Sequence, residues 1–289
     1  MKDFPDNRLS GADKLGQLQL ILLRILRVFH EICEENGLRY WLDSGTLLGA
    51  VRHGGFIPWD DDIDVVMPRD DYRKFCQIAG DSLPYDMFFQ SPETDPGFIC
   101  PWVKIRDRFS HLEEKTGPYP YSQAASIDIF PAVLGTKRHL NWRLFYIMLE
   151  PFAKMPERAW PQLKAISRCK NLLIGSSQRL FRFFMGARPL RACFERYLDR
   201  GERFWQYEPP IRWLNAWPPD MVFPLRKLRF EGLDFWGPGD PDAYLRDYFG
   251  DYMTPPPLEK RVSEHGVDAI FPIGPNPHFS GLDWKEHHG

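Results

Sequence analysis

The sequence lacks the features of a secreted or membrane-spanning chain. Its five cysteines are odd in number and share no close spacing, which predicts neither a disulfide framework nor a paired-cysteine metal site. No Asn-x-Ser/Thr glycosylation acceptor occurs, and no apolar run approaches the length of a membrane span. The N-terminal stretch MKDFPDNRLSGADK has no apolar core of the kind found in signal peptides. From these absences we expect a cytoplasmic protein.

Internal repeats and low-complexity tracts are absent as well, so the chain is expected to fold as a globular protein. Its apolar content of 43% and charged content of 26% are ordinary for that class. The 27 prolines gather in connecting segments, which predicts fixed turns because aromatic residues are plentiful beside them. A length of 289 residues allows one large domain or two small ones.

Charge is distributed unevenly along the chain. Residues 135–205 carry fifteen Lys and Arg against five Asp and Glu, a net charge of +10, whereas the whole chain has a net charge of −2. The remainder therefore carries a net charge of about −12. One part of the protein is expected to attract anions, and another part to require cations.

The hydrophobic pattern predicts an α+β fold with an α/β core, in which a mixed sheet is flanked by helices. Helices are expected at 13–35, 46–53 and 68–80, and strands at 39–45, 61–67, 98–107 and 126–135. Ser44 or Thr46 is expected to cap the second helix. Long helical periodicity over 137–206 predicts a helical insertion.

Four aspartates occupy five positions in FIPWDDDIDVVMP (56–68), immediately before an apolar run. On a strand, Asp62 and Asp64 would project from the same face on either side of Ile63. Carboxylates this close repel, and a hard cation such as Mg²⁺ or Mn²⁺ removes the repulsion. A solvated acidic turn is the simpler alternative. Asp60 fits a ligand acting through water and a turn or cap equally well.

A phosphate site is predicted just upstream. Ser44 and Gly45 lie at a strand-to-helix turn, where backbone N–H groups and the helix dipole favour an anion. Arg52 and His53, in the RHGG turn, are candidates for contact with a diphosphate. A salt bridge from Arg52 to the aspartate-rich loop is an equal alternative.

Asp128 is the candidate third carboxylate, because it lies among apolar residues on a predicted core strand. It would ligate metal or take the proton from an attacking hydroxyl; its alternative role is to cap a neighbouring loop. Lys104 and Arg106 share one strand face and are predicted phosphate clamps, or else exposed strand residues. Near the C-terminus, Glu259, Arg261 and His265 are weaker candidates for closing the site.

The stretch YWLDSGTLLGAVRHGGFIPWDDDIDVVMPRDDYRKF (40–75) resembles the signature of the LicD/fukutin family of the nucleotidyltransferase-fold superfamily. KIRD (104–107), IDIFP (127–131) and YFGDYMTPPPLEKR (248–261) are similar to that family's later motifs, in the same order. The resemblance covers roughly 15–135 and 225–265. It implies a catalytic core at 1–135, a basic helical insertion at 136–206 and a C-terminal segment, 207–289, that completes the core and the substrate site.

The resemblance also implies an activity. Family members transfer a substituted phosphate, such as phosphocholine or ribitol phosphate, from a CDP-activated donor to a sugar hydroxyl and release CMP. The family's catalytic and metal-binding carboxylates correspond to Asp62, Asp64 and Asp128 of this sequence. A choline donor would favour an aromatic cage, for which Trp41, Trp102, Tyr119 and Tyr121 are candidates, but chance neighbours are expected among so many aromatic residues.

Two alternatives to this reaction remain open at this stage. The chain would be a nucleotidyltransferase that attaches the nucleotide itself, or an inactive glycan- or lipid-binding scaffold, which the three carboxylates disfavour. The stretch RLFRFFMG (179–186) within the basic segment is typical of a helix on an anionic membrane surface, or it packs the insertion onto the core. The acceptor is expected to be a glycan, free or lipid-linked. Nucleic-acid binding is not expected, because no reading motif occurs.

Overall fold

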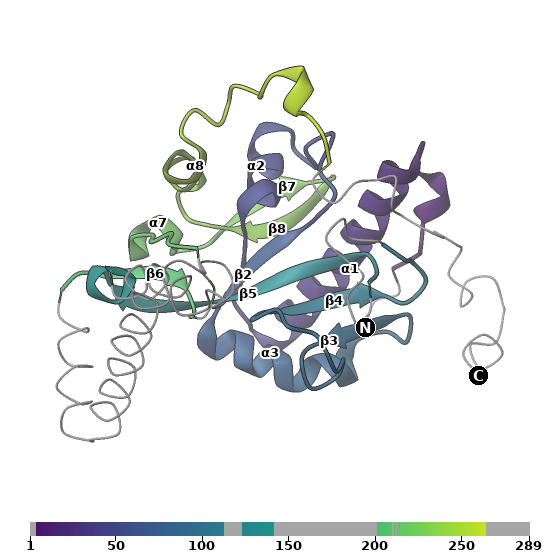
Figure 1. Ribbon diagram of the computed structural model, residues 1–289, viewed down its shortest axis with the longest axis horizontal. Coiled ribbons are helices and arrows are strands. Elements are labelled where there is room, and N and C mark those ends of the chain that lie inside the picture. Colours follow the sequence, from purple (N-terminus) through teal and green to yellow (C-terminus); the bar gives the residue numbers. More distant parts are fainter. Residues whose placement is uncertain (1–3, 113–122, 142–200, 210, 212, 264–289) are drawn as a thin grey trace, which may run out of the picture. The chain divides into compact units, whose positions relative to one another are not determined.

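The computed structural model describes residues 4–112, 123–141, 201–209, 211 and 213–263 (Figure 1). The chain divides into two compact units, Met1–Val133 together with Pro219–Gly289, and Leu134–Pro218. The first unit contains every predicted site residue that the structure describes.

A mixed sheet forms the centre of the first unit. Its strands lie in the order β1 (Trp41–Leu42), β2 (Asp64–Pro68), β5 (Ser126–Thr136), β4 (Val103–Asp107) and β3 (Met87–Gln90). The pair β2–β5 is parallel and the other pairs along this order are antiparallel. With helices flanking this sheet, the expected α+β class is confirmed.

Helices α1 (Lys14–Asn36) and α3 (Arg69–Ser82) pack against each other and against the sheet (Figure 1). The Asp13 side chain accepts a hydrogen bond from the Gly16 N–H at 2.7 Å and caps the start of α1. Gly37 ends the helix in the left-handed conformation, with φ 61°. The apolar side chains at helical spacing are buried, so the predicted first helix is confirmed.

The C-terminal part of the first unit returns to the same core. It contains α7 (Pro219–Val222), the hairpin β7 (Arg226–Phe230) and β8 (Leu233–Gly237), α8 (Pro241–Phe249) and the short helix η4 (Leu258–Lys260). Strand β8 packs against β1, and both β7 and α8 pack against α2 (Ser44–Arg52). At the hairpin tip, the Glu231 carboxylate accepts a hydrogen bond from the Phe56 N–H, next to the aspartate-rich loop.

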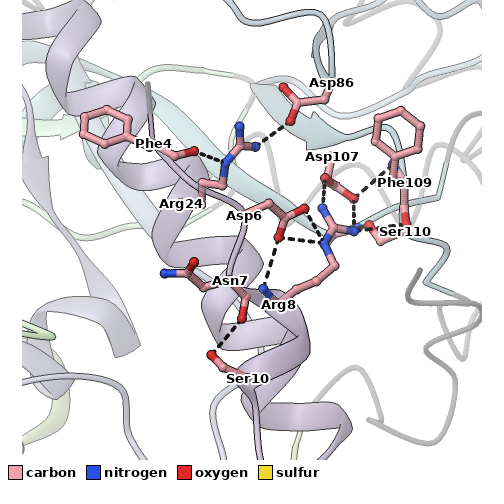
Figure 2. Close-up of polar contacts among 11 residues, drawn as sticks. Phe4, Asp6, Asn7, Arg8, Ser10, Arg24, Asp86, Asp107, Phe109 and Ser110 are labelled. Carbon is pink, nitrogen blue, oxygen red and sulfur yellow. Dashed lines mark hydrogen bonds and ion pairs between the residues drawn. The ribbon is translucent and has the colours of Figure 1, made fainter. Parts of the chain in front are cut away.

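Buried ion pairs connect the N-terminal segment to the sheet (Figure 2). In the short helix η1 (Arg8–Ser10), the Arg8 guanidinium lies 2.6 Å from Asp107 at the end of β4, and its Nε lies 2.7 Å from Asp6. Nearby, Arg24 of α1 pairs with Asp86 at 2.8 Å. Burial alone would lower the pKa of Arg8, but Asp107 and Asp6 together raise it.

In the second unit, β6 (Arg203–Tyr207) pairs with β5, and Trp205 forms a bridge with Trp217. These residues form a strand where helical periodicity was expected. Most of the basic segment, including residues 179–186, lies outside the described residues, so the predicted domain boundaries stay predictions. Within the part of the chain that the structure describes, no helix combines the length and apolarity needed to cross a membrane.

Candidate active site

Three predicted site residues meet on neighbouring strands. Asp64 of β2 is paired with Asp128 of β5, and Asp128 is paired in turn with Lys104 of β4. Residues paired across strands present their side chains on the same face of the sheet. The sequence placed these residues on three separate strands, and the order β2–β5–β4 brings them into one row.

Asp64 lies at the centre of the negative charge. Its side chain is partly buried, and this desolvation raises the pKa of Asp64 well above its ordinary value. Repulsion from Asp62, Asp128, Asp43 and Asp60 raises that pKa further. The crowding predicted from the sequence is therefore present, and it includes Asp43, which sequence reasoning missed.

Asp62 contributes to this charge from a different position than expected. Strand β2 begins at Asp64, so Asp62 belongs to the loop before the strand rather than to the strand itself. Strand β2 therefore starts later than predicted, although the Ile63 carbonyl oxygen still accepts a hydrogen bond from the Asp128 N–H at 2.8 Å. That Asp62 and Asp64 share one face stays a prediction.

Asp128 has a counter-charge and a hydrogen-bond donor. The Lys104 ammonium lies 2.7 Å from Asp128 Oδ1, and the Trp102 indole N–H donates to Oδ2 at 3.1 Å. The side chains of Lys104 and Asp128 are 13% and 18% exposed. Lys104 therefore lies at the acidic face, as the first of its two predicted alternatives requires, whereas its contact with a phosphate stays a prediction.

The predicted phosphate turn lies beside the aspartate-rich loop. Helix α2 begins at Ser44, whose φ of 45° is in the left-handed region. A Cβ added to Gly45 would lie 2.9 Å from Asp60 Oδ2, so the Asp60 carboxylate lies directly beside the start of α2. Asp43, not Ser44 or Thr46, occupies the N-cap position, while the Thr46 hydroxyl accepts a hydrogen bond from the Asp64 N–H at 2.9 Å.

Two arginines approach each other at the opposite end of α2. Arg52 donates to the Tyr252 carbonyl oxygen at 2.6 Å, and Arg261 lies over the Trp59 ring, 5.3 Å from its centre. Burial lowers the pKa of Arg52, and repulsion from Arg261 lowers it further. Burial and Arg52 likewise lower the pKa of His53. Arg52 and Arg261 thus produce a local positive charge, which favours the binding of an anion.

Arg106 does not join Lys104 in this row. It is 1% exposed, and its guanidinium donates to the Gln90 side chain of β3 and to the Ala124 carbonyl oxygen. Arg106 is therefore a buried structural residue. It is neither the phosphate clamp nor the exposed strand residue that the sequence predicted. Of the C-terminal candidates, Glu259 belongs to η4, and His265 lies outside the described residues.

The donor set at this face suits a hard divalent cation, because it offers carboxylate oxygens whose mutual repulsion a cation would relieve. Among the described residues, however, no three acidic, histidine or cysteine side chains are close enough to surround an ion. The Asp128 carboxylate is turned to Lys104 and Trp102 instead. Asp62 and Asp64 are therefore the residues that would hold the cation, with Asp128 beside them.

Two further observations concern other candidate sites. A cavity of about 540 Å³ lies along β3 and the residues after β4, and its lining includes Phe88 and Arg108 but none of the predicted site residues. Trp41, a candidate for an aromatic cage, is completely buried and donates to the Tyr244 hydroxyl, so it belongs to the core. Trp102 remains the one described aromatic candidate at the acidic face.

Comparison with known proteins gives a match to one family. Residues 37–165 match the family described as LicD/FKTN/FKRP, nucleotidyltransferase domain. The matched range begins just before β1 and includes Asp62, Asp64, Lys104 and Asp128.

Individual relatives point the same way. The chain is 28% identical over 279 aligned residues to the lipopolysaccharide cholinephosphotransferase LicD of Haemophilus influenzae, covering 88% of this chain and 97% of the relative. An uncharacterized protein of Rickettsia prowazekii is 46% identical over 161 residues, which cover 47% of this chain and 60% of that protein. The human ribitol 5-phosphate transferase FKRP is 47% identical over 49 residues, 17% of this chain and 10% of FKRP.

Proposed function

We propose that this chain is a metal-dependent phosphotransferase, because its residues 37–165 match the LicD/FKTN/FKRP nucleotidyltransferase domain. It would move a substituted phosphate, phosphocholine or a polyol phosphate, from a CDP-activated donor to a glycan hydroxyl and release CMP. The names of two relatives, a cholinephosphotransferase and a ribitol 5-phosphate transferase, support this substrate class.

The observation that carries the proposal is the row Asp64–Asp128–Lys104 on three adjacent strands. A protein gains no stability from a carboxylate that is desolvated beside other carboxylates, so such a cluster favours a functional role. The same cluster argues against an inactive scaffold.

A divalent cation held by Asp62 and Asp64 would neutralise charge on the donor diphosphate and on the departing CMP. The acceptor oxygen forms the new bond to the phosphorus of the substituted phosphate, and the bond from that phosphorus to the CMP oxygen breaks. Asp128 would take the hydroxyl proton, and its carboxylate is oriented by the Lys104 ammonium at Oδ1 and by the Trp102 indole N–H at Oδ2. The alternative role of Asp128, as a metal ligand, requires Lys104 to release it.

The donor phosphates are expected at the start of α2 and at the cations around it. Ser44 and Gly45 would bind phosphate oxygens through backbone N–H groups, which have no partner within the helix in its first turn. Arg52 and Arg261 supply positive charge at the other end of α2, and His53 lies next to Arg52 as a candidate hydrogen-bond donor. Lys104 is next to the transferred phosphate on this arrangement.

The test is CMP release across a panel of CDP-alcohols, with CDP-choline, CDP-ribitol and CDP-glycerol offered together with a glycan acceptor and Mg²⁺ or Mn²⁺. We expect one donor to be used, and activity to disappear in excess chelator and in Asp64→Asn. Full activity in chelator would refute the metal requirement. Absence of CMP release with every donor would refute the proposed reaction.

A second reaction, attachment of the nucleotide itself, is distinguished by labelling. With donors labelled separately in the cytidine and in the alcohol, our proposal requires the alcohol label, and not the cytidine label, on the acceptor. Retention of the cytidine label would identify a nucleotidyltransferase.

The acceptor is proposed to be a glycan, and the Haemophilus influenzae relative is named for lipopolysaccharide. A lipid-linked acceptor would favour peripheral contact with the inner face of the membrane through the basic segment 135–205. Co-sedimentation with anionic and neutral vesicles at low and high salt tests this contact. Equal recovery in the supernatant under all conditions would exclude it.

A further inference from the structure

Two tyrosines of α8 contact the turn in front of α2. The Tyr244 hydroxyl donates to Asp43 Oδ1 at 2.7 Å, and the Ser44 hydroxyl donates to the Tyr248 hydroxyl oxygen at 3.1 Å. The tyrosines are four residues apart and therefore lie on the same face of α8, the helix that packs against α2. Contacts between residues about 200 positions apart thus fasten the C-terminal part of the chain to this turn.

The same turn is bonded to Asp64 on both sides. The Asp43 N–H donates to the Asp64 carbonyl oxygen at 3.0 Å, and the Asp64 N–H donates to the Thr46 hydroxyl at 2.9 Å. Both backbone groups of Asp64 are therefore held by residues 43–46. A displacement of the turn would move the Asp64 carboxylate with it.

The turn has a conformation that needs support. Ser44 has a φ of 45°, which costs free energy for a residue with a Cβ and persists where surrounding contacts hold it. The support is buried: Asp43 and Tyr244 are both inaccessible to solvent, and the Trp41 indole N–H donates to the Tyr244 hydroxyl at 3.2 Å. Burial also raises the pKa of Tyr244 well above its ordinary value, so its hydroxyl keeps its proton and remains a donor.

We propose that Tyr244 and Tyr248 are positioning residues for Asp64, acting through the turn 43–46. On this proposal, the C-terminal helix α8 affects catalysis by positioning Asp64 and does not contact the substrate. This inference rests on the proposed function for its effect on turnover, whereas its effect on the turn itself is independent of the reaction.

The experiment compares Tyr244→Phe, Tyr248→Phe and the double variant with a matched control, Tyr40→Phe. Each substitution removes only a hydroxyl. Tyr40 is also fully buried, but its hydroxyl bonds to His30 of α1 and not to the turn. For each protein we would measure the thermal midpoint, hydrogen exchange of the peptide covering 41–48, Mn²⁺ affinity without substrate, and kcat and KM for the CDP-alcohol.

We expect faster exchange of the 41–48 peptide and about 10-fold weaker Mn²⁺ binding in the double variant, with the single variants between it and the wild type. Its kcat should fall by about 10-fold or more. Tyr40→Phe should lower the thermal midpoint about as much as the tyrosine variants of α8 do. Its peptide exchange over 41–48, its Mn²⁺ affinity and its kcat should match those of the wild type.

A double variant that matches Tyr40→Phe in exchange and in Mn²⁺ affinity would overturn the inference. If the wild type transfers no substituted phosphate from any donor, the proposed function fails. Exchange of the 41–48 peptide then still decides whether the tyrosines hold the turn.

Discussion

The Lys104 ammonium lies 2.7 Å from Asp128 Oδ1, and the two residues occupy directly paired positions on β4 and β5. Asp128 is itself paired with Asp64 on its other side, so the strand position of Asp128 lies between the Lys104 cation and the Asp64 carboxylate, which four other aspartates repel. The Lys104 ammonium is thus the positive charge that partly balances the negative charge of Asp128.

Replacing this lysine is expected to destabilise the metal-free protein. Lys104→Met should lower the free energy of unfolding by about 1–3 kcal/mol in chelator, because a poorly solvated carboxylate loses its charged partner. Mg²⁺ should recover part of that loss. Urea unfolding with EDTA or Mg²⁺ measures both effects. The control is Lys227→Met, whose exposed contact with Glu34 is 3.6 Å long and should contribute less than about 1 kcal/mol. Equal losses in the two variants would contradict the prediction.

Asp128→Asn is expected to reduce stability. The carboxylate is bound to the Lys104 ammonium and to the Trp102 indole N–H, and the neutral amide would lose the charged contact. A double-mutant cycle with Lys104→Met should give a coupling energy of about 0.5–3 kcal/mol, whereas additive losses would show that the ion pair is not formed in solution.

The crowding at Asp64 predicts a pH dependence of stability in chelator. The pKa of Asp64 in the folded protein is raised, so folding favours its protonated form. Its contribution to stability is full below the unfolded pKa, about 3.9, and is lost as pH rises through the higher folded pKa. Asp64→Asn should therefore melt at a higher temperature than the wild type at pH 7 and at the same temperature near pH 4. Parallel melting curves across this range would refute the prediction.

Excess Mg²⁺ at pH 7 should stabilise the wild type more than Asp64→Asn, because the variant lacks one of the two carboxylates proposed to hold the cation.

Local features of the sequence were sufficient for several elements. Helix α1 has an aspartate cap, a glycine end and apolar side chains at helical spacing, all within one stretch of chain. The candidate carboxylates were also visible locally, because aspartates beside buried apolar residues have no simple structural role. These inferences needed no knowledge of which strands are neighbours.

The remaining features depend on tertiary structure. Residue alternation assigned Lys104 and Arg106 to one strand face, but it does not tell which part of that face is covered by other elements. In the structure Arg106 is buried, whereas Lys104 is paired with Asp128. The pairing of Asp43 with Tyr244 joins residues 201 positions apart, and no local signal predicts it. The β7–β8 hairpin and α8 were missed although they have local signals. Glu231 and Gly232 form the hairpin turn with φ of 49° and 74°, and Asp240 caps α8 just before a proline.

The final prediction concerns the N-terminal segment shown in Figure 2. Arg8 is 1% exposed and makes two hydrogen bonds to the Asp107 carboxylate, at 2.6 and 3.1 Å, besides its contact with Asp6. Removing one partner of a buried ion pair leaves the other charge desolvated, so Arg8→Met alone should cost about 3–5 kcal/mol of unfolding free energy. Asp107→Leu alone should cost a similar amount, because it leaves the arginine buried with Asp6 as its remaining charged contact here.

The two changes combined should cost less than their sum, since no charge of this pair remains buried. The matched control is Arg229→Met, which removes an exposed pair with Asp234 whose side chains are 63% and 57% exposed; its cost should stay below about 1 kcal/mol. Urea unfolding of all four proteins measures these differences. A loss for Arg8→Met no greater than that for Arg229→Met would show that the N-terminal segment is not fastened to β4 in solution. With the predicted loss, this segment is part of the core that positions the strands carrying Lys104 and Asp128.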